Sequence, residues 1–358
     1  MFIIDAHLDL SLNALEYNRD LRLPVDEIRK RELGMNDKPD RAKNTVSIPA
    51  LKNGNIGLVV ATQIARYVEA GSPLPGWNSP QQAWAQTQGQ MAWYKAMEDA
   101  GEMIQVNNAK ALTDHISLWM NDAISVDEKP IGYILSLEGA DSLINISYLE
   151  KAYAYGLRAL GPAHYGPGRY SPGTGMAGPL TPMGIELLRE MDRLNMILDV
   201  THLTDEAFDQ AMNLFKGHVW ASHHNCRQLV PHQRQLTDDQ IKILIERGAV
   251  IGGVLDDWML CANWVRGESD PVKMGANLGR LIDHYDHICQ LAGNCNHIAI
   301  GSDLDGMFGK EQSPSDLDTI EDLQKLQPLL LKRGYSHADI ERIFYGNWLG
   351  FLQKAWAL

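Results

Sequence analysis

Short apolar runs alternate with amphipathic stretches along most of the chain. Each run is aliphatic or β-branched and too short for a helix, which is typical of strands buried on both faces. The predicted strands are Phe2–Ile4, Ile56–Ile64, Ile131–Leu137, Leu157–Leu160, Met196–Val200, His218–Ala221, Ala249–Val254 and Ile298–Ile300. Apolar positions with helical spacing predict helices over Gln81–Ala100, Pro182–Leu194, Asp205–Leu214, Thr237–Glu246 and Val272–Leu291. Thr181 before Pro182, and the capping-box pattern that begins at Thr237, mark two helix starts.

Eight predicted strands that alternate with helices favour an α/β fold. We expect a (β/α)8 TIM-type barrel with rim excursions rather than an open doubly wound sheet. Residues 1–358 are predicted to form a single domain. A charged segment at about 18–46 and a Gly- and Pro-rich segment at 67–80 are expected to leave the barrel near its rim. No GxGxxG motif follows a predicted strand and no GxxxxGK[ST] motif occurs, so the nucleotide-binding signatures are missing from the sequence.

Polar side chains follow six of the eight predicted strands. His7 and Asp9 are two positions apart on an extended segment, so both side chains point to the same face. The third, fourth, fifth, sixth and eighth runs are followed by Glu138, by His164, by His202, by His223 with His224, and by Asp303. Taken alone, the His7 and Asp9 pair is better explained by a histidine in a turn with a capping aspartate, and Glu138 is explained equally well by a buried salt bridge. A satisfied core histidine or a capping aspartate would explain any one of the others.

Together these residues form a stronger pattern than any one of them. In a barrel of this kind the chemistry lies where the strands end, so the imidazoles and carboxylates are expected to converge on one rim. So many buried ionisable groups are costly unless divalent cations neutralise them. Nitrogen and oxygen ligands without thiolate favour two Zn²⁺ ions, with manganese or iron as alternatives.

The composition limits the partners of the protein. Lys and Arg total 32 against 45 Asp and Glu, a formal net charge of −13, which argues against nucleic-acid or anionic-membrane binding. A small-molecule substrate is the partner that we expect. Four cysteines without a CxxC pair favour reduced thiols. The N-terminal MFIIDAHLDL lacks the features of a signal peptide and no apolar run has the length of a membrane span, so a cytoplasmic location is expected.

The motifs at the strand ends resemble those of a known family. HLD after the first strand, LEG after the third, the block GPLTPMGIELLREMDRLNMILDVTHLTDEAF, and then ASHHNCR and IGSDLDG occur in order. They resemble the membrane (renal) dipeptidase family of zinc peptidases, peptidase family M19, which belongs to the amidohydrolase-like barrels. The likeness runs from about residue 1 to residue 350, and its central block and GSDxDG motif are specific.

The resemblance implies a binuclear zinc hydrolase that cleaves the amide bond of dipeptides. One zinc would be held by His7, Asp9 and Glu138, and Glu138 would bridge to a second zinc held by His202 and His223. The spacing alone leaves His223 and His224 open as ligands, and the family pattern selects His223. The nucleophile would be a metal-bridging hydroxide.

Three further roles follow from the same resemblance. His164 matches a histidine that polarises the substrate carbonyl, Asp303 matches the catalytic acid/base, and Arg234 matches an arginine that binds the substrate carboxylate. A homodimer is also implied. The chain departs from the family where Leu8 replaces the usual Asn, where Ala140-Asp141 follows Gly139, and in the loop GPGRYSPGTG after His164.

Two alternative functions remain open on the sequence. The same barrel could hydrolyse another amide, a lactam or an N-acyl amino acid. A non-catalytic metal-binding barrel is the alternative from a different class, and Asp303 argues against it because a structural metal site needs no additional acid/base.

Overall fold

The computed structural model describes residues 1–357 and contains a strand at every apolar run; Leu358, which the predicted domain included, lies outside the described residues. The carboxyl ends of these strands carry the candidate site. The strands are β1 Ile3–Leu8, β2 Ile56–Gln63, β3 Met103–Gln105, β4 Ile131–Glu138, β5 Leu157–Gly161, β6 Ile197–Asp199, β7 Val219–Trp220, β8 Ile251–Gly253 and β9 Ile298–Ile300.

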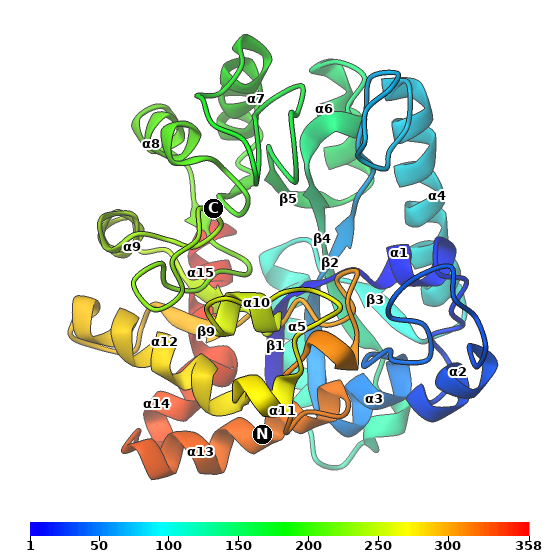
Figure 1. The fold of residues 1–358 in the computed structure, drawn as a ribbon, viewed down its shortest axis with the longest axis vertical. Coiled ribbons are helices and arrows are strands. Elements are labelled where there is room, and N and C mark those ends of the chain that lie inside the picture. The colour runs from blue at the N-terminus through cyan, green and yellow to red at the C-terminus, as the bar shows by residue number, and fades with distance from the viewer. Residues whose placement is uncertain (358) are drawn as a thin grey trace.

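Neighbouring strands pair in parallel and curl into the wall of a barrel. One sheet has the order β1-β2-β4-β5-β6-β7 with β3 beside β4, and β8 pairs with β9. A bridge between Ala221 and Ile251 joins the two sheets. At the remaining edge, the N–H of Asp303 donates to the carbonyl of His7 at 3.2 Å. The α/β class and the TIM-type barrel are therefore confirmed, with the strands central and the helices around them (Figure 1).

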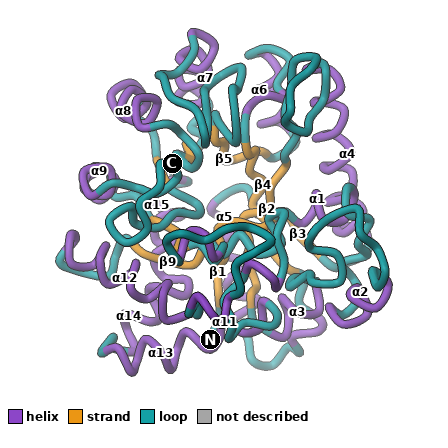
Figure 2. Tube along the Cα trace, viewed as in Figure 1, coloured by secondary structure: helices purple, strands orange, loops and turns teal. Residues whose placement is uncertain are grey.

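Helices cover the outside of the barrel, and loops gather over its centre in the view of Figure 2. The Thr181 side chain accepts the N–H of Gly184, and Thr237 forms a capping box with Gln240, as the sequence predicts. The α-helices are α1 Leu10–Leu15, α2 Val25–Arg31, α3 Ile48–Asn53, α4 Pro80–Asp99, α5 Ala109–Trp119, α6 Ser147–Ala154, α7 Pro182–Arg193, α8 Asp205–Leu214, α9 Asp238–Glu246, α10 Asp257–Leu260, α11 Pro271–Met274, α12 Leu278–Ala292, α13 Leu326–Arg333, α14 His337–Glu341 and α15 Asn347–Ala355.

Three details of the predicted elements were wrong. The first strand extends to Leu8, so His7 lies within β1 rather than after it. Strand β3 was not predicted because it has only three residues, of which Ile104 is exposed. The helix predicted over 272–291 is divided into α11 and α12, because Gly275 adopts a left-handed φ of 66° that ends α11 and Asn277 then caps α12.

The two predicted excursions are built differently. The 18–46 segment contains α2 and is attached to the barrel through Asp305, whose carboxylate accepts the N–H groups of Thr45 and Val46 at 2.6 and 3.0 Å. The 67–80 segment folds back on itself, with Tyr67 bridged to Trp77. It therefore stays close to the carboxyl end of β2.

Candidate active site

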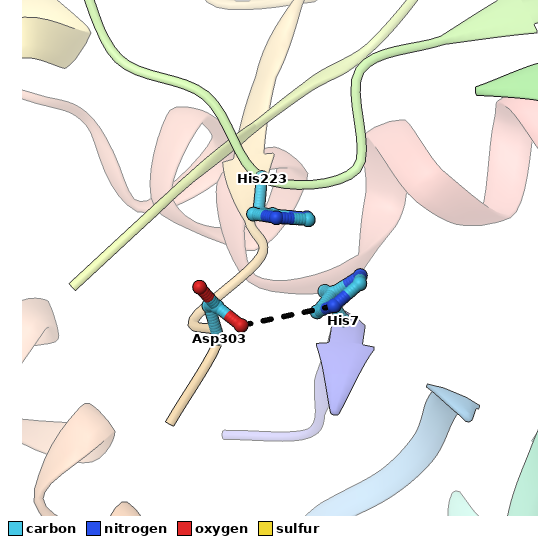
Figure 3. A group of neighbouring side chains, drawn as sticks. All are labelled: His7, His223 and Asp303. Carbon is cyan, nitrogen blue, oxygen red and sulfur yellow. Dashed lines mark ion pairs between the residues drawn. The ribbon is translucent and has the colours of Figure 1, made fainter. Parts of the chain in front are cut away.

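The carboxyl ends of the strands bring the candidate ligands together. His7 comes from β1, Glu138 from the end of β4, His202 from the turn after β6, and His223 from the turn after β7. Asp303, after β9, faces His7 and His223 (Figure 3). We call the group of His7, Asp9, Glu138, His202, His223 and Asp303 the cage.

Glu138 lies between two sets of imidazoles. Its Oε2 is 3.5 Å from Nε2 of His7, while its Oε1 is 3.1 Å from Nε2 of His202 and 3.5 Å from Nε2 of His223. Ligand atoms 2.0–2.1 Å from a tetrahedral zinc lie roughly 3.4 Å from one another. The two carboxylate oxygens therefore face two different sets of nitrogens at spacings that fit two ions.

The His7 side of Glu138 carries further carboxylates. Nε2 of His7 is 3.9 Å from Asp9 Oδ1 and 3.7 Å from Asp303 Oδ1, and it has no hydrogen-bond partner although it is buried. Asp9 Oδ1 accepts a hydrogen bond from Thr62 in β2. A buried nitrogen that is surrounded by acceptor oxygens and lacks a hydrogen-bond partner is a good metal ligand.

The charges of the cage are poorly balanced without a metal. Burial opposes protonation of His7, yet the charges of the carboxylates, Glu138 above all, raise its pKa to about 10. Burial and the charge of Glu138 raise the pKa of Asp9 to about 6. Burial lowers the pKa values of His202 and His223 well below the ordinary range. Among residues 1–357, no Lys or Arg forms a salt bridge with a cage carboxylate, so the donor set fits divalent cations.

Two cage residues have a strained backbone. His202 has a φ of 69° and Asp303 a φ of 59°, conformations that non-glycine residues adopt rarely. Asp199 accepts the N–H groups of Thr201 and Ser222 at 3.0 and 3.2 Å, and so fixes the residues before His202 and His223. Asp199 therefore links the backbone turns that carry two of the candidate ligands.

His164 and Asp303 are more accessible than the remaining candidates. Their side chains are 12% and 16% exposed, whereas those of the candidate ligands are between 2% and 8% exposed. Nε2 of His164 is 4.0 Å from Glu138 Oε1. Burial and the neighbouring carboxylates raise the pKa of Asp303 well above its usual value, although His7 opposes this shift. Both residues are therefore within reach of a bound molecule.

Arg234 is buried beside the cage. Its Nη2 donates to the carbonyl of His223 at 3.0 Å, while Nε and Nη1 have no partner. Arg234 is only 3% exposed, so it is not a solvated loop cation. A buried guanidinium with unused donors is suited to an anionic ligand.

Several other polar residues near the strand ends lie outside the cage. His224 belongs to none of the candidate metal-binding groups among the described residues, and its Nδ1 is 3.5 Å from the hydroxyl of Thr201. Adjacent residues of an extended segment point to opposite faces, so only one of His223 and His224 can face the cage. Asp305 attaches the 18–46 segment, as described above. Trp258 donates to Asp256 at 2.7 Å and packs against His232 at a ring distance of 4.7 Å.

Sequence reasoning missed two charged residues at this rim. Arg66, three residues after β2, contacts His164 Nδ1 at 2.8 Å. Asp256, three residues after β8, is buried and affects the pKa of Asp303. Arg66 follows the predicted strand Ile56–Ile64, and Asp256 follows the predicted strand Ala249–Val254. Neither strand has a His, Asp or Glu directly after its apolar run, so the sequence pattern indicates no candidate residue there. A cavity of about 140 Å³ opens next to Arg66 and His164 and is lined also by Trp77.

Comparisons with known proteins bear on the family and the fold of this chain. The family model described as membrane dipeptidase (peptidase family M19) matches residues 1–357. The crystal structure of a dipeptidase, a metallopeptidase of family M19, superposes with a TM-score of 0.79 at 22% identity, covering 100% of this chain and 99% of that chain. A metallopeptidase from Rhodobacter sphaeroides, bound to a phosphinate mimic of the dipeptide L-Ala-D-Ala, gives a TM-score of 0.77 at 22% identity and covers 99% of each chain.

A curated relative is named dipeptidase tcpJ, from Claviceps purpurea. It is 29% identical over 234 residues, which are 62% of this chain and 51% of that protein, so the match spans about half of the relative's length. Within residues 1–357, no helix has the length and apolar character needed to cross a membrane. The resemblance predicted from the motifs is confirmed: the chain belongs to the membrane dipeptidase family of metallopeptidases, peptidase family M19.

Proposed function

We propose that this protein is a binuclear zinc dipeptidase. His7, Asp9 and Glu138 would hold one ion, and Glu138, His202 and His223 the other. The observation that carries this proposal is the division of the two Glu138 oxygens, one toward His7 and the other toward His202 and His223. A single ion would need only one of these two sets of ligands.

Bound zinc supplies Lewis-acid chemistry: it lowers the pKa of a water molecule to about 7 and polarises a carbonyl group. The protein side chains orient the substrate and move protons around this chemistry. Asp303 accepts a proton from the attacking water and delivers it to the leaving nitrogen, so that one carboxylate acts first as base and then as acid. Its 16% exposed side chain, 3.7 Å from Nε2 of His7, places it within reach of both atoms.

His164 and Arg234 bind the substrate in this proposal. His164 hydrogen-bonds to the carbonyl oxygen as negative charge develops on it, which stabilises the transition state. Arg234 binds a free carboxylate with its unused Nε and Nη1 donors. A substrate with a C-terminal carboxylate next to the cleaved amide satisfies both contacts, and a dipeptide has this chemistry. The dipeptide mimic bound to the Rhodobacter protein supports the same substrate class.

The proposal is tested by metal analysis together with a dipeptide panel, with and without a chelator. We expect about two zinc ions per chain, hydrolysis of dipeptides, loss of hydrolysis in the chelator and its return with added zinc. Activity that survives complete metal removal would contradict the proposal, and so would a zinc-replete protein that cleaves no dipeptide.

The substrate carboxylate gives a second test. Arg234→Met should lower kcat/KM for dipeptides by about 10–100-fold, as expected for the loss of charge-assisted hydrogen bonds. It should change kcat/KM much less for the matching dipeptide amides, which lack the carboxylate. An equal loss for the two substrate series would contradict the proposed role of Arg234.

A further inference from the structure

We propose that Arg66 is a positioning residue that fixes the tautomer of His164, so that His164 donates a hydrogen bond toward the cage and does not bind metal. This inference rests on the proposed function for its catalytic consequence, whereas its structural content stands on the contacts of Arg66 and His164 alone. By position, His164 could be a metal ligand, because its ring lies within ligand distance of Glu138 and His202.

The contact between Arg66 and His164 assigns the proton on the imidazole. Nη2 of Arg66 is 2.8 Å from Nδ1 of His164. A guanidinium has five N–H donors and no acceptor, so Nδ1 must be the acceptor in this hydrogen bond. An imidazole whose Nδ1 accepts carries its hydrogen on Nε2, the nitrogen that faces Glu138. That nitrogen has no free lone pair for a metal ion.

The candidate ligand histidines His202 and His223 have a different kind of partner on Nδ1. Nδ1 of His202 is 2.9 Å from the hydroxyl of Thr174, and Nδ1 of His223 is 2.9 Å from the hydroxyl of Ser222. A hydroxyl can accept a hydrogen bond, so Nδ1 of each ring can donate and leave the Nε2 lone pair free for metal. Nε2 of His202 is also 3.4 Å from Nη2 of Arg234, a contact in which the ring nitrogen is the acceptor. A hydroxyl partner on Nδ1 therefore matches a ligand histidine, and a guanidinium partner on Nδ1 matches a donor histidine.

The 67–80 segment holds Arg66 in place over His164. Nη1 of Arg66 donates to the carbonyl of Pro75 at 3.0 Å, and the carbonyl of Arg66 accepts the N–H of Trp77 at 2.9 Å. On the other side, the N–H of Thr174 donates to the carbonyl of His164 at 2.8 Å. Both partners are thus fixed by their own loops, and the excursion after β2 acquires a role in the active site.

The consequence concerns the substrate carbonyl. An N–H group next to the cage can hydrogen-bond to an oxygen as it gains negative charge, which a nitrogen lone pair cannot do. Without Arg66, the imidazole of His164 would be free to adopt the other tautomer, to rotate, or to bind metal through Nε2. Arg66 acts on the reaction only through His164.

The direct test is ¹⁵N NMR of histidine-labelled protein, in the metal-free and the zinc-loaded state, with His164 assigned by its loss in His164→Gln. We expect Nδ1 of His164 to be unprotonated and Nε2 to be protonated in both states, with no zinc-induced shift typical of a ligand. In Arg66→Met we expect a mixture of tautomers or the reverse tautomer. A protonated Nδ1 or a zinc-bound Nε2 in the unmodified protein would overturn the inference.

Kinetics give an independent readout. Arg66→Met should lower kcat by about 10–100-fold, the usual effect of losing a residue that orients a metal-site or catalytic group, with KM and bound zinc nearly unchanged. Arg66→Lys keeps a donor and should recover part of kcat. Arg169→Met is the control, because Arg169 lines a cavity with Arg66 while its guanidinium donates, among the described residues, only to backbone carbonyls of the 141–144 segment. A loss in Arg169→Met equal to that in Arg66→Met would overturn the inference.

The two proposals can fail separately. If the unmodified protein contains zinc and cleaves dipeptides while His164 has its proton on Nδ1, the proposed function stands and the role of Arg66 is wrong. If the protein cleaves no dipeptide, the proposed function is wrong, while the NMR spectrum of the metal-free protein still decides the tautomer.

Discussion

The protein buries two clusters of charged residues, and they are built in opposite ways. In the first, which we call the Arg19 cluster, Arg19, Glu32, Asp40, Arg41 and Asp305 lie where the 18–46 segment meets the barrel. Arg19 donates to Glu32 at 2.8 and 3.1 Å and to Asp40 at 3.3 Å, and Arg41 donates to Glu32 at 2.7 Å. In the second cluster, the cage, the carboxylates face imidazoles and one another.

The difference lies in the source of the positive charge. The Arg19 cluster contains two permanent cations, and Asp305 is further satisfied by Thr45 and Val46. Within the described part of the chain, no Lys or Arg is in salt-bridge contact with a cage carboxylate. A buried cluster with its own arginines holds the structure together, whereas one that lacks them is prepared for an ion that arrives from solution.

The largest expected effect is a loss of kcat on changing Glu138 in the cage, but not on changing Glu32 in the Arg19 cluster. Glu138→Gln should lower kcat by more than about 10³-fold, because Glu138 is shared by both proposed metal sites. This loss is larger than the one caused by removing a single oxyanion-hole donor. Glu32→Gln, in the Arg19 cluster, should leave kcat per folded molecule within about twofold, since it touches no cage residue. Steady-state kinetics on variants checked for folding by circular dichroism measure both. Similar losses in the two variants would remove the distinction between the clusters.

The next effect is on stability. Arg19→Met should lower the free energy of unfolding by about 3–5 kcal/mol, because it leaves the buried carboxylates of Glu32 and Asp40 without their main cation. Bound zinc per folded chain should not change. Denaturant unfolding together with metal analysis measures both quantities, with Arg22→Met as the control because Arg22 forms only an exposed pair with Asp20. Loss of zinc in Arg19→Met at full folding would contradict this account.

The smallest effect concerns a residue behind the cage. Thr174→Val should weaken zinc binding by about 10–100-fold, because Nδ1 of His202 loses its hydroxyl partner. Competition with a chromophoric chelator measures the affinity. Thr113→Val is the matched control, since that hydroxyl bonds only to Ala109 on the surface of α5. Unchanged zinc affinity in Thr174→Val would show that the hydroxyl does not orient His202.

Much of the barrel could be predicted from the sequence because its strands and helix starts are marked by patterns of neighbouring residues. Strands buried on both faces appear as continuous apolar runs, and helix starts appear as capping residues such as Thr181 and Thr237. The wrong predictions also concern short stretches of the chain. Strand β3 is short and half exposed, and the break at Gly275 is a single left-handed residue within an otherwise helical pattern.

The site was predictable only in part because some of its contacts join distant segments. His7, Glu138, His202, His223 and Asp303 could be found since each lies at or just after the end of an apolar run. Arg66 could not, because its role depends on how the 67–80 segment folds back toward His164, 98 positions away in the chain. The role of Asp305 could not be predicted either. Its place in the GSDLDG motif suggests the active site, but its carboxylate instead binds Thr45, which lies 260 positions away in the chain.

The central claim is that Glu138 is shared by two metal ions, and anomalous diffraction from crystals of the zinc-loaded protein tests it most directly. The account predicts two zinc peaks, one on each side of Glu138: the first bound by His7 and Asp9, and the second by His202 and His223, with His164 bound to neither. A single peak, or a zinc ion ligated by His164, would contradict it.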